Sequence, residues 1–383
     1  MEIAGGLYRE LCCVPAWNAL LGSGGRAAAA ISAVSANSTL HAYAEDFENP
    51  DVTALARLGI NMHLSPRPSA VVFSYFHPLS IPHIQPPLGE ISRQPAIQVS
   101  GDAVLRFGFL EGDAVVDARR AVYDPQTWRR PAPFRANGSV ARELAIVLNE
   151  LELRSTAGLD DLGSAASHLI EQQDADVIVA KGGTRGATVF ERGGRVTHIP
   201  AYRSSRVFKI GTGDVFSAIF AHHWAETGLP AVDAADIASR SVAAYCSTAR
   251  LPPLDDALQN RVPVTSATPG TVLIEGAVGT IGQRYTMEEA RFLLRELCVD
   301  VTSAALDGSS SSPPEAILVL ADGLSEEAMC RVQYAKAAGV PIVVLREDGV
   351  HGVGSSVDWG GTTVTDDFVS ALYFTVWATS GRA

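Results

Sequence analysis

Four consecutive residues, Gly211-Thr212-Gly213-Asp214, could bind a phosphate and activate a hydroxyl group, and an apolar helical pattern over 213–228 follows them. Glycines allow several backbone N–H groups to turn toward one point, and a helix that begins there adds the positive end of its dipole. An aspartate at the mouth of such an anion hole can take the proton from an attacking alcohol. The alternative is a plain strand-to-helix turn in which Asp214 only balances the helix dipole, and four residues alone do not separate the two.

Two other stretches carry related chemistry. Asn149 and Glu152 lie three residues apart, where an amide and a carboxylate could support a magnesium ion through water. Lys181, Gly183 and Gly186 lie in the run KGGTRGA, a glycine-rich turn that would let a nucleotide approach the backbone. Each also has a plain alternative, because helices contain many such polar pairs and a glycine run can be only a tight turn.

The elements around these residues alternate between strands and helices from about residue 95 to residue 250. Apolar β-branched runs predict strands at 96–102, 114–125, 143–153 and 174–183, and spacing of three to four predicts helices at 161–173 and 213–228. This alternation predicts a mostly parallel sheet covered on both faces. The segment 187–200, with Gly193-Gly194 at its centre, predicts an antiparallel hairpin that extends the sheet.

Length and composition indicate a folded protein of two domains. The chain has 383 residues, more than one hydrophobic core usually serves, with 47% hydrophobic and 19% charged residues. A net charge of −12 argues against a nucleic-acid partner, although a helix N-terminus can still bind a small anion. Five scattered cysteines without metal spacing, and no apolar run of membrane length, lead us to expect a cytoplasmic protein with no membrane partner.

A second α/β pattern follows a proline-rich stretch. We expect a first domain over 1–255, a linker over 256–270 and a second domain over 271–383. The second domain is predicted to contain strands at 271–277, 316–322 and 340–348, and helices at 286–297, 325–339 and 365–377.

In order and spacing, the motifs of the first domain resemble those of the ribokinase-like (PfkB) family of carbohydrate and nucleoside kinases. That family has an N-x-x-E motif, a G-x-x-G turn after a strand, a hairpin, and then G-x-G-D at the start of a long helix. The likeness spans about 1–255 and is strong from about 95 onward. It implies a ribokinase-like, doubly wound and mostly parallel sheet, with ATP and Mg²⁺ as cofactors. It further implies that Asp214 is the catalytic base, that Gly211, Thr212 and Gly213 form the anion hole, that Asn149 and Glu152 support the metal, and that Lys181, Gly183 and Gly186 face ATP.

This sequence also departs from the family. Phe208-Lys209 replaces an Asp-Thr pair, and Lys209 could contact phosphate. Gly24-Gly25 resembles the sugar-contacting segment, but alanines replace its asparagine, so the run after Gly25 could equally be a buried helix. Tyr75, within 71–84, could stack on a substrate ring from a lid or belong to a structural strand and turn.

The second domain resembles the nucleoside 2-deoxyribosyltransferase-like group, which implies a smaller Rossmann-like (flavodoxin-like) α/β fold. Arg331 stands where that group has its nucleophilic glutamate, three residues before Tyr334. Because arginine cannot attack an anomeric carbon, we expect a nucleotide-binding or regulatory domain. A packing domain, or N-glycosidic cleavage by a different carboxylate, is the alternative.

Together these features predict an ATP-dependent phosphotransferase that acts on a hydroxyl of a nucleoside or sugar. We expect a small-molecule substrate and a homodimer. The competing interpretation is a catalytically weak sensor of nucleotides or nucleosides, and the altered Phe208-Lys209 pair and Arg331 favour it.

Overall fold

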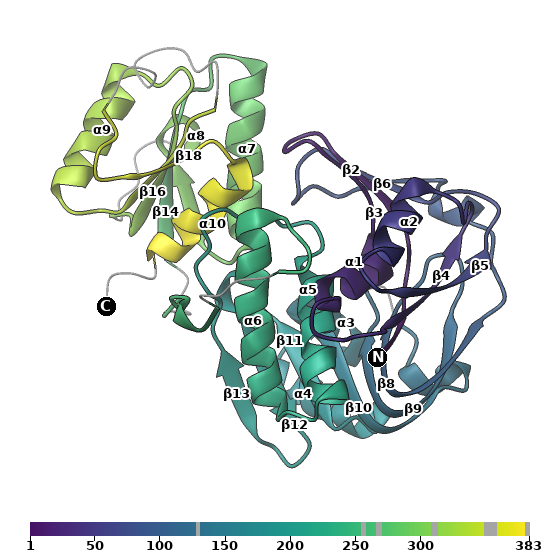
Figure 1. The fold of residues 1–383 in the computed structure, drawn as a ribbon. Coiled ribbons are helices and arrows are strands. Elements are labelled where there is room, and N and C mark those ends of the chain that lie inside the picture. Colours follow the sequence, from purple (N-terminus) through teal and green to yellow (C-terminus); the bar gives the residue numbers. More distant parts are fainter. Residues whose placement is uncertain (128–130, 254–257, 266–269, 308–312, 348–357, 380–383) are drawn as a thin grey trace. The chain divides into compact units, whose positions relative to one another are not determined.

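The computed structural model describes residues 1–127, 131–253, 258–265, 270–307, 313–347 and 358–379. The chain forms two compact units, Met1–Val262 and Pro263–Ala383 (Figure 1). The boundary falls within the predicted linker 256–270, of which residues 256–257 and 266–269 lie outside the described ranges. Among the described helices, none has the length and apolar character that crossing a membrane requires.

Unit 1 is built on a nine-stranded sheet that is mostly parallel. Its order is β13 (Val196–Ile199), β12 (Ala187–Glu191), β11 (Val177–Lys181), β10 (Val140–Asn149), β9 (Ala114–Asp124), β8 (Ile97–Phe107), β1 (Glu2–Ala4), β4 (Thr39–Ala44) and β5 (Asn61–Pro66). All pairs from β11 to β5 are parallel, whereas β12 and β13 form the predicted antiparallel hairpin. The expectation of a doubly wound, mostly parallel sheet is confirmed.

Helices cover both faces of this sheet. Successive strand residues point to opposite faces, and here both sets are apolar, so each face packs against helices. Val147 and Val179 pack in one core with α1 (Gly22–Ile31), α5 (Thr212–Ala221) and α6 (Ala231–Thr248). Their neighbours Ile146 and Ile178 pack in a second core with α3 (Glu150–Ala157) and α4 (Leu162–Gln173). The alanine run after Gly25 lies within α1, whose ten residues are all buried.

Strands β8 and β9 are joined without a helix. The connection, residues 108–113, has six residues, although parallel neighbours usually need a dozen or more. Eleven straight residues would span about 33 Å, and so short a connection can return only about 25 Å. The two strands therefore bend, as their ribbons show in Figure 1, and both of their halves contribute to the second core.

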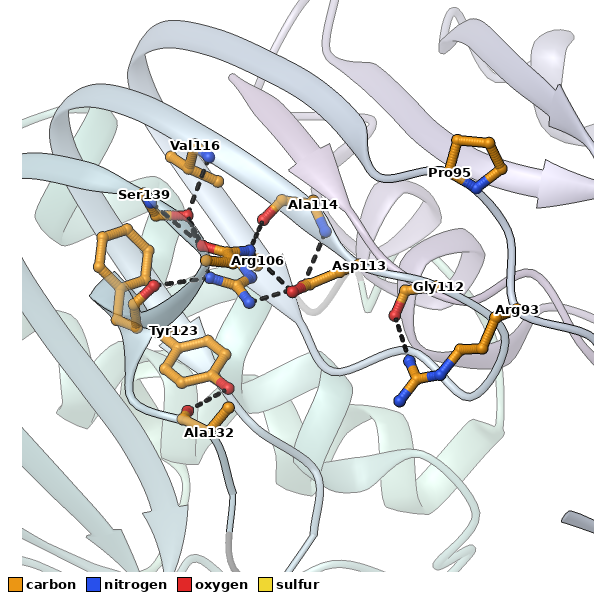
Figure 2. Close-up of polar contacts among 12 residues, drawn as sticks. Arg93, Pro95, Arg106, Gly112, Asp113, Ala114, Val116, Tyr123, Ala132 and Ser139 are labelled. Carbon is orange, nitrogen blue, oxygen red and sulfur yellow. Dashed lines mark hydrogen bonds and ion pairs between the residues drawn. The ribbon is translucent and has the colours of Figure 1, made fainter. Parts of the chain in front are cut away.

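A buried arginine holds this bend together. Arg106, near the end of β8, is 3% exposed and donates from Nη2 to Oδ1 of Asp113, just before β9, at 2.6 Å. It also donates from Nη1 to the Phe134 carbonyl at 2.9 Å and to Ser139 Oγ at 3.2 Å. Its guanidinium lies over the ring of Tyr123, 4.9 Å from the centroid (Figure 2).

A separate four-stranded sheet contains the segment 71–84. Its order is β3 (Trp17–Leu20), β2 (Arg9–Cys12), β6 (Val72–Tyr75) and β7 (His83–Gln85), in which β2 and β6 are parallel and the other pairs antiparallel. Segment 71–84 is thus a strand, a turn and a strand. The remaining helix of this region is α2 (Pro50–Ala56), which starts at an Asn49 cap.

Unit 2 has a five-stranded parallel sheet. Its order is β15 (Asp300–Ser303), β14 (Thr271–Glu275), β16 (Ala316–Leu320), β17 (Ile342–Leu345) and β18 (Thr363–Thr365), with helices α7 (Ile281–Glu296), α8 (Ala304–Asp307), α9 (Glu326–Ala337) and α10 (Phe368–Thr379). In chain order this is 2-1-3-4-5, the order of flavodoxin-like folds. The predicted flavodoxin-like architecture is confirmed.

Several predicted boundaries are wrong, for identifiable reasons. The strand predicted to reach residue 153 ends at Asn149, because a capping box there starts α3. The helix predicted over 213–228 is an α-helix only to Ala221, and a π-helical turn, His222–Glu226, follows it. The three- and four-residue strands β18 and β15 were not predicted at all.

Candidate active site

Asp214 lies in the first turn of α5, next to a left-handed turn. Gly211 caps this helix with φ +72°, and its carbonyl accepts the helical bond from Val215 N at 3.1 Å. A side chain at Gly211 would collide with Arg26, since a Cβ there would lie 2.1 Å from Arg26 Nε. The first N–H groups of a helix have no acceptor within it, and here the Thr212 amide makes only a long bond, 3.4 Å, to the Lys209 carbonyl. This turn therefore offers amide donors and a positive dipole end to an anion.

Arg26 bonds the Asp214 carboxylate and links it to Glu10. Arg26 Nη1 donates to Asp214 Oδ2 at 3.0 Å and to Glu10 Oε1 at 2.9 Å, and its Nη2 bonds the second oxygen of Glu10. Arg26 Nε donates to the Tyr245 hydroxyl at 3.3 Å. Gln126 Nε2 donates to the other Asp214 oxygen at 2.5 Å. Arg26 is 0% exposed and Asp214 is 8% exposed.

The surroundings of Asp214 shift its pKa in opposite directions. Burial raises the pKa of Asp214 above its ordinary value, the Arg26 charge opposes this rise, and Asp124 and Glu10 add to it. For Arg26, burial alone would lower the pKa, but Glu10 and other neighbours outweigh it and the pKa is raised. Arg26 therefore stays charged and favours the ionised form of Asp214.

Two lysines flank the same turn. Lys209 Nζ donates to Thr212 Oγ1 at 2.8 Å, and Lys181 Nζ would lie 3.5 Å from a Cβ built on Gly213. The chain has three lysines in total, so two of them stand at this helix start. With Arg26 beside Gly211, cations border each residue of the predicted anion hole.

A second acidic group lies behind Lys181. Lys181 Nζ donates to Asp124 Oδ2 at 2.7 Å, and the same oxygen accepts from Ser217 Oγ at 2.7 Å. Burial raises the pKa of Glu152, and the nearby Asp124 charge raises it further. Burial alone would lower the pKa of Lys181, but Asp124 and Glu152 outweigh it, so its pKa is raised.

Asn149 and Glu152 form the capping box of α3. Asn149 Oδ1 accepts from Glu152 N, and Glu152 Oε2 accepts from Asn149 N, both at 2.8 Å. Over the described ranges, no three His, Cys, Asp or Glu side chains are grouped so as to hold a metal ion. Mg²⁺ usually binds one or two carboxylates together with phosphates and water. Asp124 and Glu152 fit that donor set, because they are two carboxyl groups near enough that the charge of Asp124 raises the pKa of Glu152.

The other predicted binding residues are placed as follows. Gly183 and Gly186 bound a tight turn after β11 with positive φ at both, and a Cβ at Gly186 would lie 2.1 Å from the Ile199 carbonyl. A Cβ at Gly24 would lie 2.6 Å from the Gly5 carbonyl, and at Gly25 2.9 Å from a Leu7 methyl, so both glycines let α1 approach its neighbours.

Tyr75 and Phe208 lie near residues of the Arg26 network. Burial raises the pKa of Tyr75, and the charge of Glu10 adds to the rise, which places Tyr75 within electrostatic reach of the site. Phe208 is buried, with its ring 4.8 Å from that of Trp17 and 5.8 Å from that of Tyr245. The departure at Phe208 is therefore an aromatic packing position between β3 and α6.

Sequence reasoning missed four residues of this site, Glu10, Arg26, Asp124 and Gln126. Arg26 follows directly after Gly24-Gly25, and a charged residue inside an otherwise apolar helix was an available signal. Asp124 ends a predicted strand that aligns in register with the strand before Asn149, a second signal. Glu10 lies in a short strand with no distinguishing pattern.

In unit 2, Arg331 is tied to a buried carboxylate. Arg331 Nε and Nη2 donate to the two oxygens of Glu275, at 2.7 and 3.0 Å, and Nη1 donates to Glu327. Glu275 ends β14 and is 1% exposed. Asp322, after β16, accepts from Gln283 Nε2 at 3.0 Å. Glu275 is thus a buried acid that carries a fixed counter-charge.

No family model matches this chain, and a comparison with curated proteins found no match. Solved structures do match. Ribokinase from Giardia lamblia is 14% identical over 66% of this chain and 95% of that one, with a TM-score of 0.50. Fructokinase from Vibrio cholerae O395, in a form with bound fructose, ADP and calcium ion, is 13% identical over 68% and 98%, with a TM-score of 0.49. A pyrophosphate-dependent kinase in the ribokinase family, complexed with a pyrophosphate analog and myo-inositol, is 13% identical over 68% and 98%, with a TM-score of 0.48. At such identities the likeness shows the fold alone: the large sheet of this chain has the ribokinase fold.

Proposed function

We propose that the chain is an ATP-dependent phosphotransferase that transfers the γ-phosphoryl group to a hydroxyl of a sugar or nucleoside. The observation that carries this proposal is the position of Asp214. Its buried carboxylate lies in the same helical turn as the amides of Thr212 and Gly213, with Lys181 and Lys209 at the edge of that turn. A base and an anion hole are thereby built into one short stretch of chain.

In this proposal each group has a defined task. Asp214 accepts the proton of the acceptor hydroxyl as the oxygen attacks the γ-phosphorus. The amides at the start of α5 and the ammonium groups of Lys181 and Lys209 stabilise the charge on the transferred phosphoryl group. Asp124 and Glu152 would hold Mg²⁺, partly through water, and the bound metal would neutralise charge on the donor phosphates.

Unit 2 is proposed to bind a nucleotide or to regulate unit 1. In flavodoxin-like sheets, ligands bind at the carboxyl ends of the strands, where the strand order reverses. Glu275 and Asp322 lie at the ends of β14 and β16, the pair at that reversal. The Arg331–Glu275 pair disfavours Glu275 as a nucleophile for N-glycosidic cleavage, because its two oxygens already accept hydrogen bonds.

The test is ADP release from Mg-ATP in the presence of a panel of sugars and nucleosides. We expect acceptor-dependent ADP release, and a fall of about 10²–10⁴-fold in Asp214→Asn, the usual range for loss of a general base. Isosteric asparagine keeps a polar group beside Arg26 and Gln126, so the variant reports on proton transfer more than on packing.

A sensor is the second candidate, because Asp214 is already paired with Arg26. A sensor would bind ligands, visible as thermal stabilisation, without ADP release from any acceptor. That result would overturn the kinase proposal.

A further inference from the structure

Arg26 on α1 links several residues of the candidate site. Its guanidinium spans Asp214, Glu10 and the Tyr245 hydroxyl, and Nη1 also donates to the Gly22 carbonyl at 3.3 Å. Tyr245 in turn donates to the Ile210 carbonyl at 3.0 Å, just before the anion-hole turn. The network joins α1, β2, α5 and α6 through one fully buried cation.

We propose that Arg26, anchored by Glu10, is a positioning residue that keeps the Asp214 carboxylate ionised and fixed in direction. The geometry supports both parts. The Arg26–Asp214 bond is 3.0 Å long, and the guanidinium rests on the face of Gly211, where no side chain fits. Glu10 bonds two guanidinium nitrogens, a paired arrangement that fixes the plane of the group as well as its place.

The charges around Asp214 explain why such a residue is needed. Burial disfavours a carboxylate, and further acids nearby disfavour it more, so an ionised base in this place requires a cation in contact with it. The groups that face it from the surrounding elements are Glu10 on β2, Tyr75 on β6, Arg26 on α1, Asp124 on β9, Lys181 on β11 and Tyr245 on α6, with Gln126 after β9. Among the cations of this set, Arg26 is the one that bonds Asp214, whereas Lys181 bonds Asp124.

The test measures the titration of Asp214 directly. Carboxyl ¹³C NMR of aspartate-labelled full-length protein gives the titration midpoint, and Asp214→Asn identifies the signal. We expect Arg26→Met to move the midpoint upward by about 1–3 pH units, the usual effect of one charge in contact. Arg26→Lys should restore part of the shift, because it returns the charge without the paired geometry.

Arg106 supplies the matched control. It is also a buried arginine paired with an aspartate, but it lies in the bend of β8 and β9 (Figure 2). Arg106→Lys and Arg106→Met should lower stability and leave the Asp214 midpoint in place. If Arg26→Met does not fold, the comparison of Arg26→Lys with Arg106→Lys still tests the inference. An unchanged Asp214 midpoint in Arg26→Lys, or an equal shift in the Arg106 variant, overturns the inference.

The role in turnover rests on the proposed kinase function, whereas the titration does not. With an active acceptor, the acidic limb of the kcat profile should move in parallel with the Asp214 midpoint, and kcat at high pH should stay below that of the wild type, because the carboxylate is ionised there but no longer fixed in direction. A shifted midpoint with no ADP release from any acceptor overturns the kinase proposal and supports the inference. A shifted midpoint with an unmoved kcat limb overturns the role of Arg26 in turnover.

Discussion

Gly211 and Gly213 belong to one turn but meet different neighbours. Gly211 has φ +72°, and a Cβ would collide with the Arg26 side chain at 2.1–2.3 Å, whereas the nearest atom to a Cβ at Gly213 is Lys181 Nζ at 3.5 Å. We expect Gly211→Ala to lower the free energy of unfolding by roughly 2–5 kcal/mol, the sum of left-handed strain and overpacking. Gly213→Ala should change it by less than about 1 kcal/mol. Urea titration of both variants checks this, and equal losses would contradict the contact with Arg26.

The sequence predicted part of this site and not the rest, for a physical reason. Asp214, Gly211 and Lys209 lie in one contiguous motif, so their local geometry follows from neighbouring residues. Arg26 and Asp214 are 188 positions apart, and the packing of α1 against α5 brings them together. Arg26 and Glu10 are 16 positions apart and join α1 to the separate strand β2. Long-range charge pairs leave no local pattern.

At the scale of elements, Asn149 and Glu152 have two readings that one experiment separates. As a capping box they stabilise α3. As metal support they would also affect the Mg²⁺ concentration that ADP release requires. Asn149→Ala should cost about 1 kcal/mol of stability, as cap losses usually do. Asp161→Ala, at the Asp161 cap of α4, is the matched control and should cost a similar amount. Only Asn149→Ala should raise the Mg²⁺ concentration needed for half-maximal ADP release, and equal magnesium curves would leave the cap as its only role.

The π-helical turn after α5 carries a pH-dependent element. Burial, assisted by the neighbouring His222, lowers the pKa of His223 to about 4 from 6.5. Between pH 6.5 and 4, His223 is protonated in the unfolded chain but stays neutral in the folded chain. The free energy of unfolding therefore decreases as the pH falls from 6.5 toward 4. The full shift corresponds to at most about 3 kcal/mol, and screening of the half-buried ring reduces it. His223→Gln should remove this acid sensitivity, measured as Tm at pH 7 and pH 5, while the exposed His198→Gln should not.

The bend of β8 and β9 is a feature of these strands that the sequence did not predict. The strand predicted over 114–125 is in place, whereas the strand predicted over 96–102 is too short, because β8 continues to Phe107. The bend was not predicted, since it depends on Arg106 reaching Asp113 across the fold of both strands. Likewise the strand before Asn149 was predicted four residues too long, because the apolar pattern continues into α3.

At the scale of the whole molecule, each unit keeps its own core and its own sheets. The two large hydrophobic clusters of unit 1 end before Val262, and the cluster of unit 2 begins after Pro263. All residues assigned to the proposed phosphoryl transfer, among them Asp214 and Lys181, lie in Met1–Val262. The proposed chemistry therefore belongs to unit 1.

This assignment predicts the behaviour of the chain after cleavage between the units. Limited proteolysis near Pro263 should release a fragment of about residues 1–262 that keeps its circular dichroism spectrum and its cooperative unfolding, because none of its described sheets is interrupted. The same fragment should release ADP with the acceptors that serve the full chain, and Asp214→Asn in the fragment is the control. A folded fragment without turnover, beside an active full chain, would contradict a site built from unit 1 alone. An altered KM with unchanged kcat would instead assign to unit 2 the regulatory role proposed for it, since binding would change while the groups that perform the transfer remained in place.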